Sequence, residues 1–143
     1  MVAGRLVTGT WSLGNLSNWK TSKVTASTSM FREAGMSTSS WSVGDISGWD
    51  MSSNTIIHCM FHEAGSKASN FYPGNIGNWN TSKVKNMRSV FYECGLKKSR
   101  RTLDLSNWNC SSITEADTKF CRGVESYVIQ PNWSRYGVYL EPV

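Results

Sequence analysis

Residues 74–95 read GNIGNWNTSKVKNMRSVFYECG, and versions of this stretch recur along the chain. Two further copies are GNLSNWKTSKVTASTSMFREAG at residues 14–35 and GDISGWDMSSNTIIHCMFHEAG at residues 44–65. A fourth, LDLSNWNCSSITEADTKFCRGV at residues 103–124, is divergent. Self-similarity at a fixed period of about 30 residues is typical of proteins whose units stack on one another. The chain is therefore expected to fold as an array of four units.

One tryptophan and, twelve residues later, one phenylalanine occupy matching positions in every unit. The pairs are Trp19 and Phe31, Trp49 and Phe61, Trp79 and Phe91, and Trp108 and Phe120. An aromatic slot beside a polar turn in each unit reconciles the high Ser and Asn content with a folded core. We expect these rings to be buried and to pack against their copies.

The segments between the repeats carry a second aromatic column. Its members are Trp11, Trp41 and Phe71, and Arg101 interrupts it. The expected stack spans residues 1–126, with units near residues 9–38, 39–68, 69–98 and 99–126. Residues 127–143 follow as a tail, which either caps the last unit or contacts a partner, and capping is favoured.

Within a unit, the spacing of apolar residues predicts one short strand and one short helix. In the third unit, Ile76 and Trp79 lie in an extended piece bounded by Gly and Asn. Ser82 follows at a helix N-cap position, and Val84, Met87 and later apolar residues recur at helical spacing. The predicted fold class is a β-rich α/β repeat solenoid of four leucine-rich-repeat-like units with a C-terminal cap.

The string that runs from Trp79 through Asn80-Thr81-Ser82-Lys83-Val84 to Met87 and Phe91 resembles the BspA-like leucine-rich-repeat family. This tryptophan-containing repeat occurs in mycoplasma lipoproteins, bacterial surface proteins and some phage proteins. The resemblance covers residues 9–124 and implies a non-enzymatic binding or structural role without a particular ligand. The units here are longer than is usual for the family, and no lipoprotein signal accompanies them.

Most of the excess positive charge lies in one short segment, Lys97-Lys98-Ser99-Arg100-Arg101. The formal net charge of the chain is +5, and without these four cations it would be +1. Such a cluster can bind an acidic protein face or an anionic glycan, and it is equally typical of a solvated loop between repeats. Nucleic acid is a less favoured partner because no groove-reading motif accompanies the cluster.

Two polar patterns raise the question of chemistry and are interpreted as structural. His58 and His62 are four residues apart, but the matching positions of the other units hold unrelated polar residues, so no metal site is expected. Glu33, Glu63 and Glu93 form a column with one copy per unit. Acid–base catalysis requires two carboxylates with different pKa values, and carboxylates at equivalent positions of a repeat are expected to have similar surroundings. No catalytic residue and no cofactor are predicted.

The cysteines show no framework of disulfides or metal ligands. Cys94 takes a position that is Ala34 in the first unit, which predicts a small buried residue. Reduced thiols are expected, and whether Cys59, Cys110 or Cys121 forms a disulfide is left open because no CxxC pair is present.

These features favour a recognition and assembly module over an enzyme. Residues 1–10 lack a signal-peptide core, and no stretch is long and apolar enough to span a membrane. A protein of the virion leaves the cell by assembly and lysis, so we expect a phage virion component, such as a capsid decoration protein or a tail or fibre protein. The alternatives are a BspA-like adhesin domain at a bacterial cell surface and, least favoured, a small glycan- or metal-acting enzyme.

The expected partner is a capsid or tail protein, or a glycan or protein of the host surface, and homo-oligomerisation is left open. Neither membrane insertion nor nucleic-acid binding is expected. The residues predicted to contact the partner are Lys97, Lys98, Arg100 and Arg101 in the basic segment, and Trp133, Tyr136 and Tyr139 in the tail.

Overall fold

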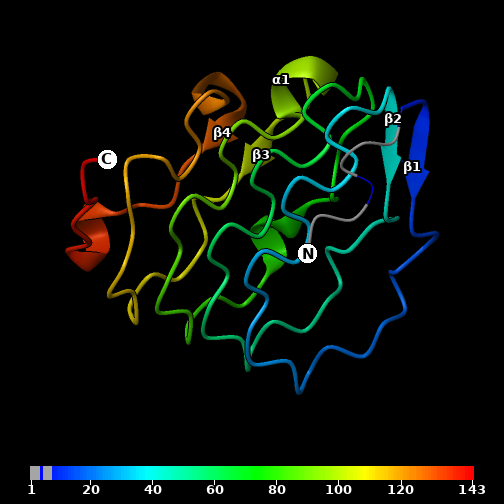
Figure 1. The fold of residues 1–143 in the computed structure, drawn as a ribbon. Coiled ribbons are helices and arrows are strands. Elements are labelled where there is room, and N and C mark those ends of the chain that lie inside the picture. Colours follow the sequence, from blue (N-terminus) through cyan, green and yellow to red (C-terminus); the bar gives the residue numbers. More distant parts are fainter. Residues whose placement is uncertain (1–3, 5–7) are drawn as a thin grey trace.

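Successive units lie side by side in the computed structural model, which describes residue 4 and residues 8–143 (Figure 1). Residues 1–3 and 5–7, part of the expected 1–126 stack, lie outside the described residues. The regular elements are β1 (Thr10–Ser12), β2 (Ser40–Ser42), the 3-10 helix η1 (Ile76–Asn78), α1 (Leu96–Ser99), β3 (Leu103–Asp104), η2 (Glu125–Tyr127), β4 (Val128–Ile129) and η3 (Ser134–Tyr136). No helix of the described residues has the length and apolar character that a membrane crossing needs.

Parallel pairing joins each unit to the next. Strands β1 and β2 pair with Trp11 opposite Trp41. Further along each unit, a row of single parallel bridges runs Ala26–Ile56–Asn86–Glu115. Paired residues are thus one repeat length apart, so the period of the sequence is also the period of the structure.

The helix predicted after each tryptophan is wrong, because this segment is a run of turns. Met60 N–H donates to the Ile57 carbonyl of its own turn (3.1 Å), whereas Phe61 N–H donates to the Val90 carbonyl of the third unit (2.8 Å). Alternate amides thus serve the turn and the neighbouring unit. Left-handed residues, which no α-helix accommodates, recur at two positions in each of the first three units: Ser29, Cys59 and Ser89, and Glu33, Glu63 and Glu93.

The strand predicted just before each tryptophan is also misplaced. Residues 16–19 form a turn, and the third unit has η1 there. Strands β1 and β2 lie earlier in their units. In the second, third and fourth units, the serine expected at a helix N-cap instead lies in a turn closed by Asp or Asn: Ser82 N–H, for example, donates to Asn80 Oδ1 (3.0 Å).

The core consists of aromatic rings stacked along the units. Trp49 is parallel to Trp79 with ring centroids 6.5 Å apart, and Phe61 is parallel to Phe91 at 5.6 Å. Phe31, Phe61, Phe91, Phe120, Trp49, Trp79 and Trp108 are buried. Trp19 is not, contrary to expectation: 54% of its surface is exposed, because the ring stacks only on Trp49 and has no described unit on its other side.

The fourth unit is shifted by one residue against the third from Asp117 onward. Phe91 N–H donates to the Phe120 carbonyl (2.7 Å), so Cys121 rather than Phe120 lies opposite Phe91 in the pairing. The buried Asp117 carboxylate fills the gap in the ladder: its two oxygens accept from Ser89 N–H and from Ser89 Oγ, both at 3.0 Å. As a result, the Phe120 ring meets Phe91 edge-on, at 80°.

The tail packs on the last unit. Strand β4 pairs in parallel with β3, and Glu141 exchanges backbone hydrogen bonds with Ala116 and Thr118, both 2.9 Å. Trp133 lies edge-on against Phe120 at 5.0 Å. Residues from 128 to 141 thus pack against the fourth unit.

Candidate partner-binding site

Helix α1 presents the basic segment from a fixed position. Leu96 is fully buried and anchors the helix in the core, and Arg100 N–H closes it on the Leu96 carbonyl (2.8 Å). Gly95 precedes the helix, and a Cβ there would lie 2.3 Å from the Gly65 carbonyl oxygen. Glycine therefore allows α1 to lie directly on the preceding unit.

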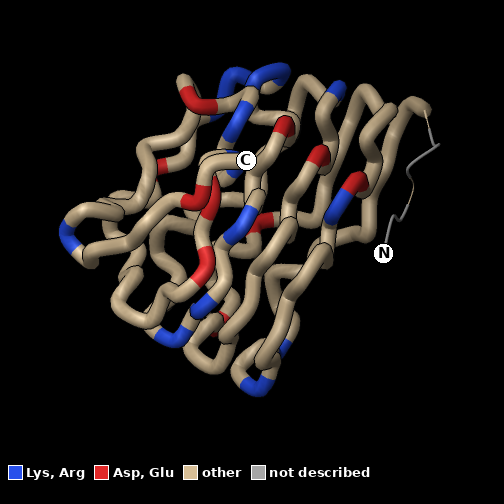
Figure 2. The backbone as a smooth tube through the Cα atoms, turned by 60° about the vertical axis from the view of Figure 1, so that its left-hand side comes forward, with Lys and Arg blue, Asp and Glu red and all other residues tan. Residues whose placement is uncertain are grey.

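Three cations of this segment are exposed and have no ion-pair partner in the described part of the chain. Among the described residues, no carboxylate forms an ion pair with Lys97, Lys98 or Arg100. All three line one cavity of about 340 Å³, together with Ser66. Figure 2 shows Lys and Arg gathered at the top of the molecule, where α1 lies in Figure 1. The arrangement can receive an anionic group without first breaking an internal ion pair.

Arg101 differs from the other three cations because it packs on the protein. Its guanidinium carbon lies 4.0 Å above the centre of the Tyr72 ring, a cation–π contact. The residue is exposed and does not enter the core slot of Trp41 and Phe71. Arg101 therefore borders the basic surface while its planar group is held in place.

The tail residues do not form one site with the basic segment. Trp133 and Tyr136 are half-buried and pack against the core, and Trp133 Nε1 donates to Gln130 Oε1 (3.0 Å). Tyr139 is 75% exposed, and the cavity that it lines is a different one from the cavity at α1. Of the predicted tail contacts, Tyr139 has the most surface left for a partner.

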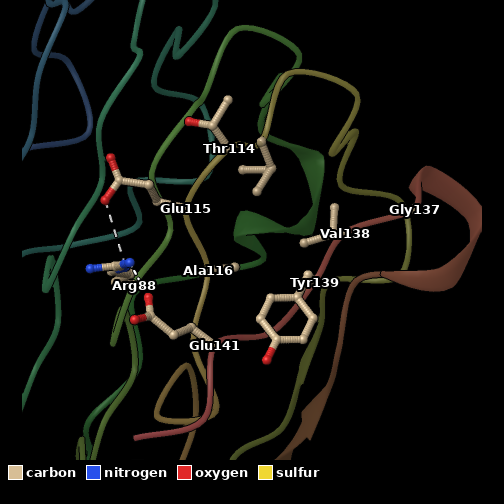
Figure 3. A pocket seen from close by; sticks show the side chains of 9 residues that line it. Arg88, Thr114, Glu115, Ala116, Gly137, Val138, Tyr139 and Glu141 are labelled. Carbon is tan, nitrogen blue, oxygen red and sulfur yellow. Dashed lines mark hydrogen bonds and ion pairs between the residues drawn. The ribbon is translucent and has the colours of Figure 1, made fainter.

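That second cavity, of about 580 Å³, lies between the fourth unit and the tail. In Figure 3, Arg88 faces Glu115 and Glu141 on one side of it, and Tyr139 lies across from them. Arg88 Nε is 3.6 Å from Glu115 Oε2, and Arg88 also pairs with Glu141. Sequence analysis missed this cluster, because its members belong to the third unit, the fourth unit and the tail.

His58 and His62 lie in a run of turns. The unrelated polar residues at the matching positions predict a slot that faces solvent, but His62 is largely buried. Its side chain is 15% exposed and stacks on Tyr92 at 4.5 Å. Burial, with a further contribution from Arg32, lowers the pKa of His62 to about 4. The described residues contain no group of three or more His, Cys, Asp or Glu placed to hold a metal ion. That the pair holds no metal stays a prediction.

The glutamate column and the cysteines contribute to packing. Burial raises the pKa of Glu63, and the carboxylates of Glu33 and Glu93 raise it further. All four cysteines are free and buried. Burial raises the pKa of Cys94 and Cys121 to about 12, so these thiols stay protonated and unreactive at neutral pH.

A family model described as "Mycoplasma protein of unknown function, DUF285" matches residues 7–130. The chain belongs to this family. No curated protein and no solved structure matches it.

The DUF285 match covers all four units, α1 and β4, so the basic segment lies within the part of the chain that the family describes. Residues 131–143, which include Trp133, Tyr136 and Tyr139, follow the matched range. Since the family has no known function, what the protein binds has to be argued from its own surface.

Proposed function

We propose that the protein is a short repeat solenoid that acts as a non-enzymatic recognition and assembly module, and that it binds an acidic partner surface through the segment from Lys97 to Arg101. The observation that carries this proposal is the set of exposed cations Lys97, Lys98 and Arg100, which share one cavity and have no ion-pair partner among the described residues. Inter-unit pairing one repeat length apart supports the solenoid.

A rigid support makes this surface suited to binding. Free lysine and arginine side chains lose conformational entropy when they bind, but the backbone of α1 is already ordered by its buried anchor Leu96. Charges on an ordered backbone can be matched by acidic residues at fixed positions of a partner. Such contacts act mainly on the association rate and on specificity, and salt weakens them.

A more specific biological role is proposed from the resemblance of the repeat to the BspA-like family. A phage virion component, in a capsid decoration, tail or fibre role, stays the prediction, and a bacterial surface adhesin domain stays the alternative. The basic surface is compatible with both, because either would bind a capsid protein or a host surface through its charge pattern.

The experiment compares two variants of equal net charge. The first changes Lys97, Lys98, Arg100 and Arg101 to Ser, and the second changes four exposed lysines elsewhere, Lys20, Lys23, Lys83 and Lys85, to Ser. Binding to poly-L-glutamate is measured by fluorescence anisotropy at about 50 mM and about 300 mM NaCl. We expect the first variant to lose roughly tenfold or more in affinity at low salt and most of the salt dependence.

The matched lysine variant should keep most of the affinity at low salt and most of the salt dependence. A triple variant that retains Arg101 controls for loss of the contact with Tyr72, and thermal melts verify the fold. If the first variant and the lysine variant weaken binding equally, the affinity reflects net charge alone, and the segment is an ordinary solvated loop.

A further inference from the structure

At the outer edge of the first unit, the described residues supply none of the carbonyl-directed hydrogen bonds that the later units receive. Carbonyls of the second unit accept amide protons of the first: Ser27 N–H to Ile56 O (2.8 Å), Ser29 N–H to His58 O (2.9 Å) and Phe31 N–H to Met60 O (2.8 Å). The corresponding carbonyls of the first unit belong to Ala26, Thr28 and Met30. None of these three accepts a hydrogen bond from the described residues.

Trp19 marks the same edge. The indole Nε1 of Trp49 donates to Leu16 O of the preceding unit (2.9 Å), and that of Trp79 donates to Ile46 O (3.0 Å). Trp19 has no such acceptor among the described residues and is 54% exposed, against 4% for Trp49. Among the described residues, nothing covers the other face of its ring or accepts from its N–H group.

A groove runs beside this ring. Its volume is about 390 Å³, and its lining includes Trp19, Val24, Met30, Trp49 and Met51. The apolar side chains among them are those that a further unit would cover. The groove and these three carbonyls thus belong to one interface that the described residues leave unfilled.

We propose that this edge binds an extended segment of a partner protein, which adds to the stack as a further unit. The partner segment donates backbone N–H groups at alternate residues to Ala26, Thr28 and Met30, and lays an aromatic ring on Trp19. Main-chain pairing would supply affinity, and the groove would supply side-chain specificity. The occupied interfaces inside the chain show this geometry, with tryptophan rings 6.0–6.5 Å apart and within 9° of parallel.

A second copy of the chain is a poor occupant. In a second copy, the amides of Ser27, Ser29 and Phe31 already donate to the second unit of their own chain, so they cannot pair with the row Ala26, Thr28 and Met30. The opposite end of the stack is covered by the tail, where Glu141 pairs with Ala116 and Thr118. This surface is separate from the basic segment, so the inference does not depend on the proposed function.

The test uses a peptide whose sequence pairs with the equivalent edge of the second unit inside the chain. Residues 14–35 cover the equivalent edge of the second unit within the chain, so a fluorescein-labelled peptide of this sequence serves as the probe. Its control carries N-methyl groups on the amides of Ser27, Ser29 and Phe31, the donors of the occupied interface. We expect saturable binding in fluorescence anisotropy, and an affinity roughly tenfold or more lower for the methylated peptide.

Variants of the protein locate the binding. Trp19→Ser and Met30→Asp should each weaken binding by roughly tenfold or more. Tyr139→Ser, which changes a residue that is 75% exposed at the other end, and the four-fold Ser variant of the basic segment should leave it unchanged. Melting temperatures verify that the variants fold.

Absence of saturable binding, or equal binding of both peptides, would overturn the proposal. Sedimentation supplies a further arm: self-association that Trp19→Ser abolishes would show that the occupant is a second copy and not a partner segment.

Discussion

Trp49 and Trp19 hold matching positions of neighbouring units, but their surroundings differ. The Trp49 ring lies between those of Trp19 and Trp79 and donates to the Leu16 carbonyl. Trp19 stacks on one side only. The same side chain is therefore a core residue in one unit and a surface residue in the next.

This difference predicts unequal effects of truncation. Trp49→Ala should lower the free energy of unfolding by about 3–5 kcal/mol, because it opens a cavity and leaves a carbonyl unpaired. Trp19→Ala, the matched control, should cost about 1 kcal/mol or less. Urea denaturation of both variants measures the two values. A Trp49→Ala protein that melts within about two degrees of wild type would contradict the stacked core.

His62 and Glu63 are neighbours whose pKa values shift in opposite directions with opposite consequences for stability. The folded-state pKa of His62, about 4, lies below its ordinary 6.5, because burial disfavours the charged ring. Its contribution to stability is present above pH 6.5 and is lost as the pH falls through 4. The raised pKa of Glu63 acts the other way: its contribution is complete below pH 4.5 and is lost as the pH rises through the folded value.

We therefore expect His62→Gln to flatten the fall in melting temperature between pH 6.5 and pH 4 relative to the wild type. Glu63→Gln should raise the melting temperature at neutral pH and have little effect below pH 4.5. Differential scanning calorimetry across this range measures both. Parallel pH profiles of His62→Gln and the wild type would show that the ring titrates as in the unfolded chain.

At the scale of the element, the segment after each tryptophan shows why periodicity alone misled. Ile57, Met60, Phe61 and Ala64 are all buried, which is also the spacing of a helix face. A run of turns returns the chain to the core at the same interval. What distinguishes the two is the backbone: alternate N–H groups pair with the next unit, and left-handed residues recur.

At the point where the fourth unit changes register, the Asp117 carboxylate replaces a backbone acceptor for Ser89. Asp117→Ala should lower the free energy of unfolding by about 2–3 kcal/mol, because the buried Ser89 N–H loses a charged acceptor. Asp104→Ala is the control, since the Asp104 carboxylate accepts only from Ser106 in an exposed turn. Chemical denaturation compares them. Equal losses would show that the Asp117 carboxylate is not what holds the shifted pairing.

At the scale of the whole molecule, the two ends of the stack differ in what covers them. The tail covers the last unit, and its removal would expose the backbone edge of residues 116–118. We expect a chain that ends at residue 137 to melt roughly 5–10 °C lower, because it loses the pairing of Glu141 and its ion pair with Arg88.

The truncated chain should also self-associate as its concentration rises, because an open edge pairs with other chains. Thermal melts and sedimentation measure the two effects. Tyr139→Ser controls for loss of an exposed tail residue and should change neither. An unchanged melting temperature after truncation would show that residues 138–143 add nothing to the stability of the stack.

The repeated columns were readable from the sequence. A spacing of 30 or 29 residues places each copy of Trp and Phe at the same point of its unit, and stacking buries all of them except Trp19 at the open edge. The basic segment could be identified in the same way, because charge is a property of the residues themselves.

Local backbone geometry and long-range contacts were decided by the tertiary structure. The sequence could not distinguish helix from turns, because both bury the same positions, and only the amides of the neighbouring unit determine which one forms. The contacts of Arg101 with Tyr72 and of Arg88 with Glu141 join residues far apart in the chain. Such pairs depend on the register between units, which the Asp117 carboxylate shifts by one residue, and no repeat pattern encodes that shift.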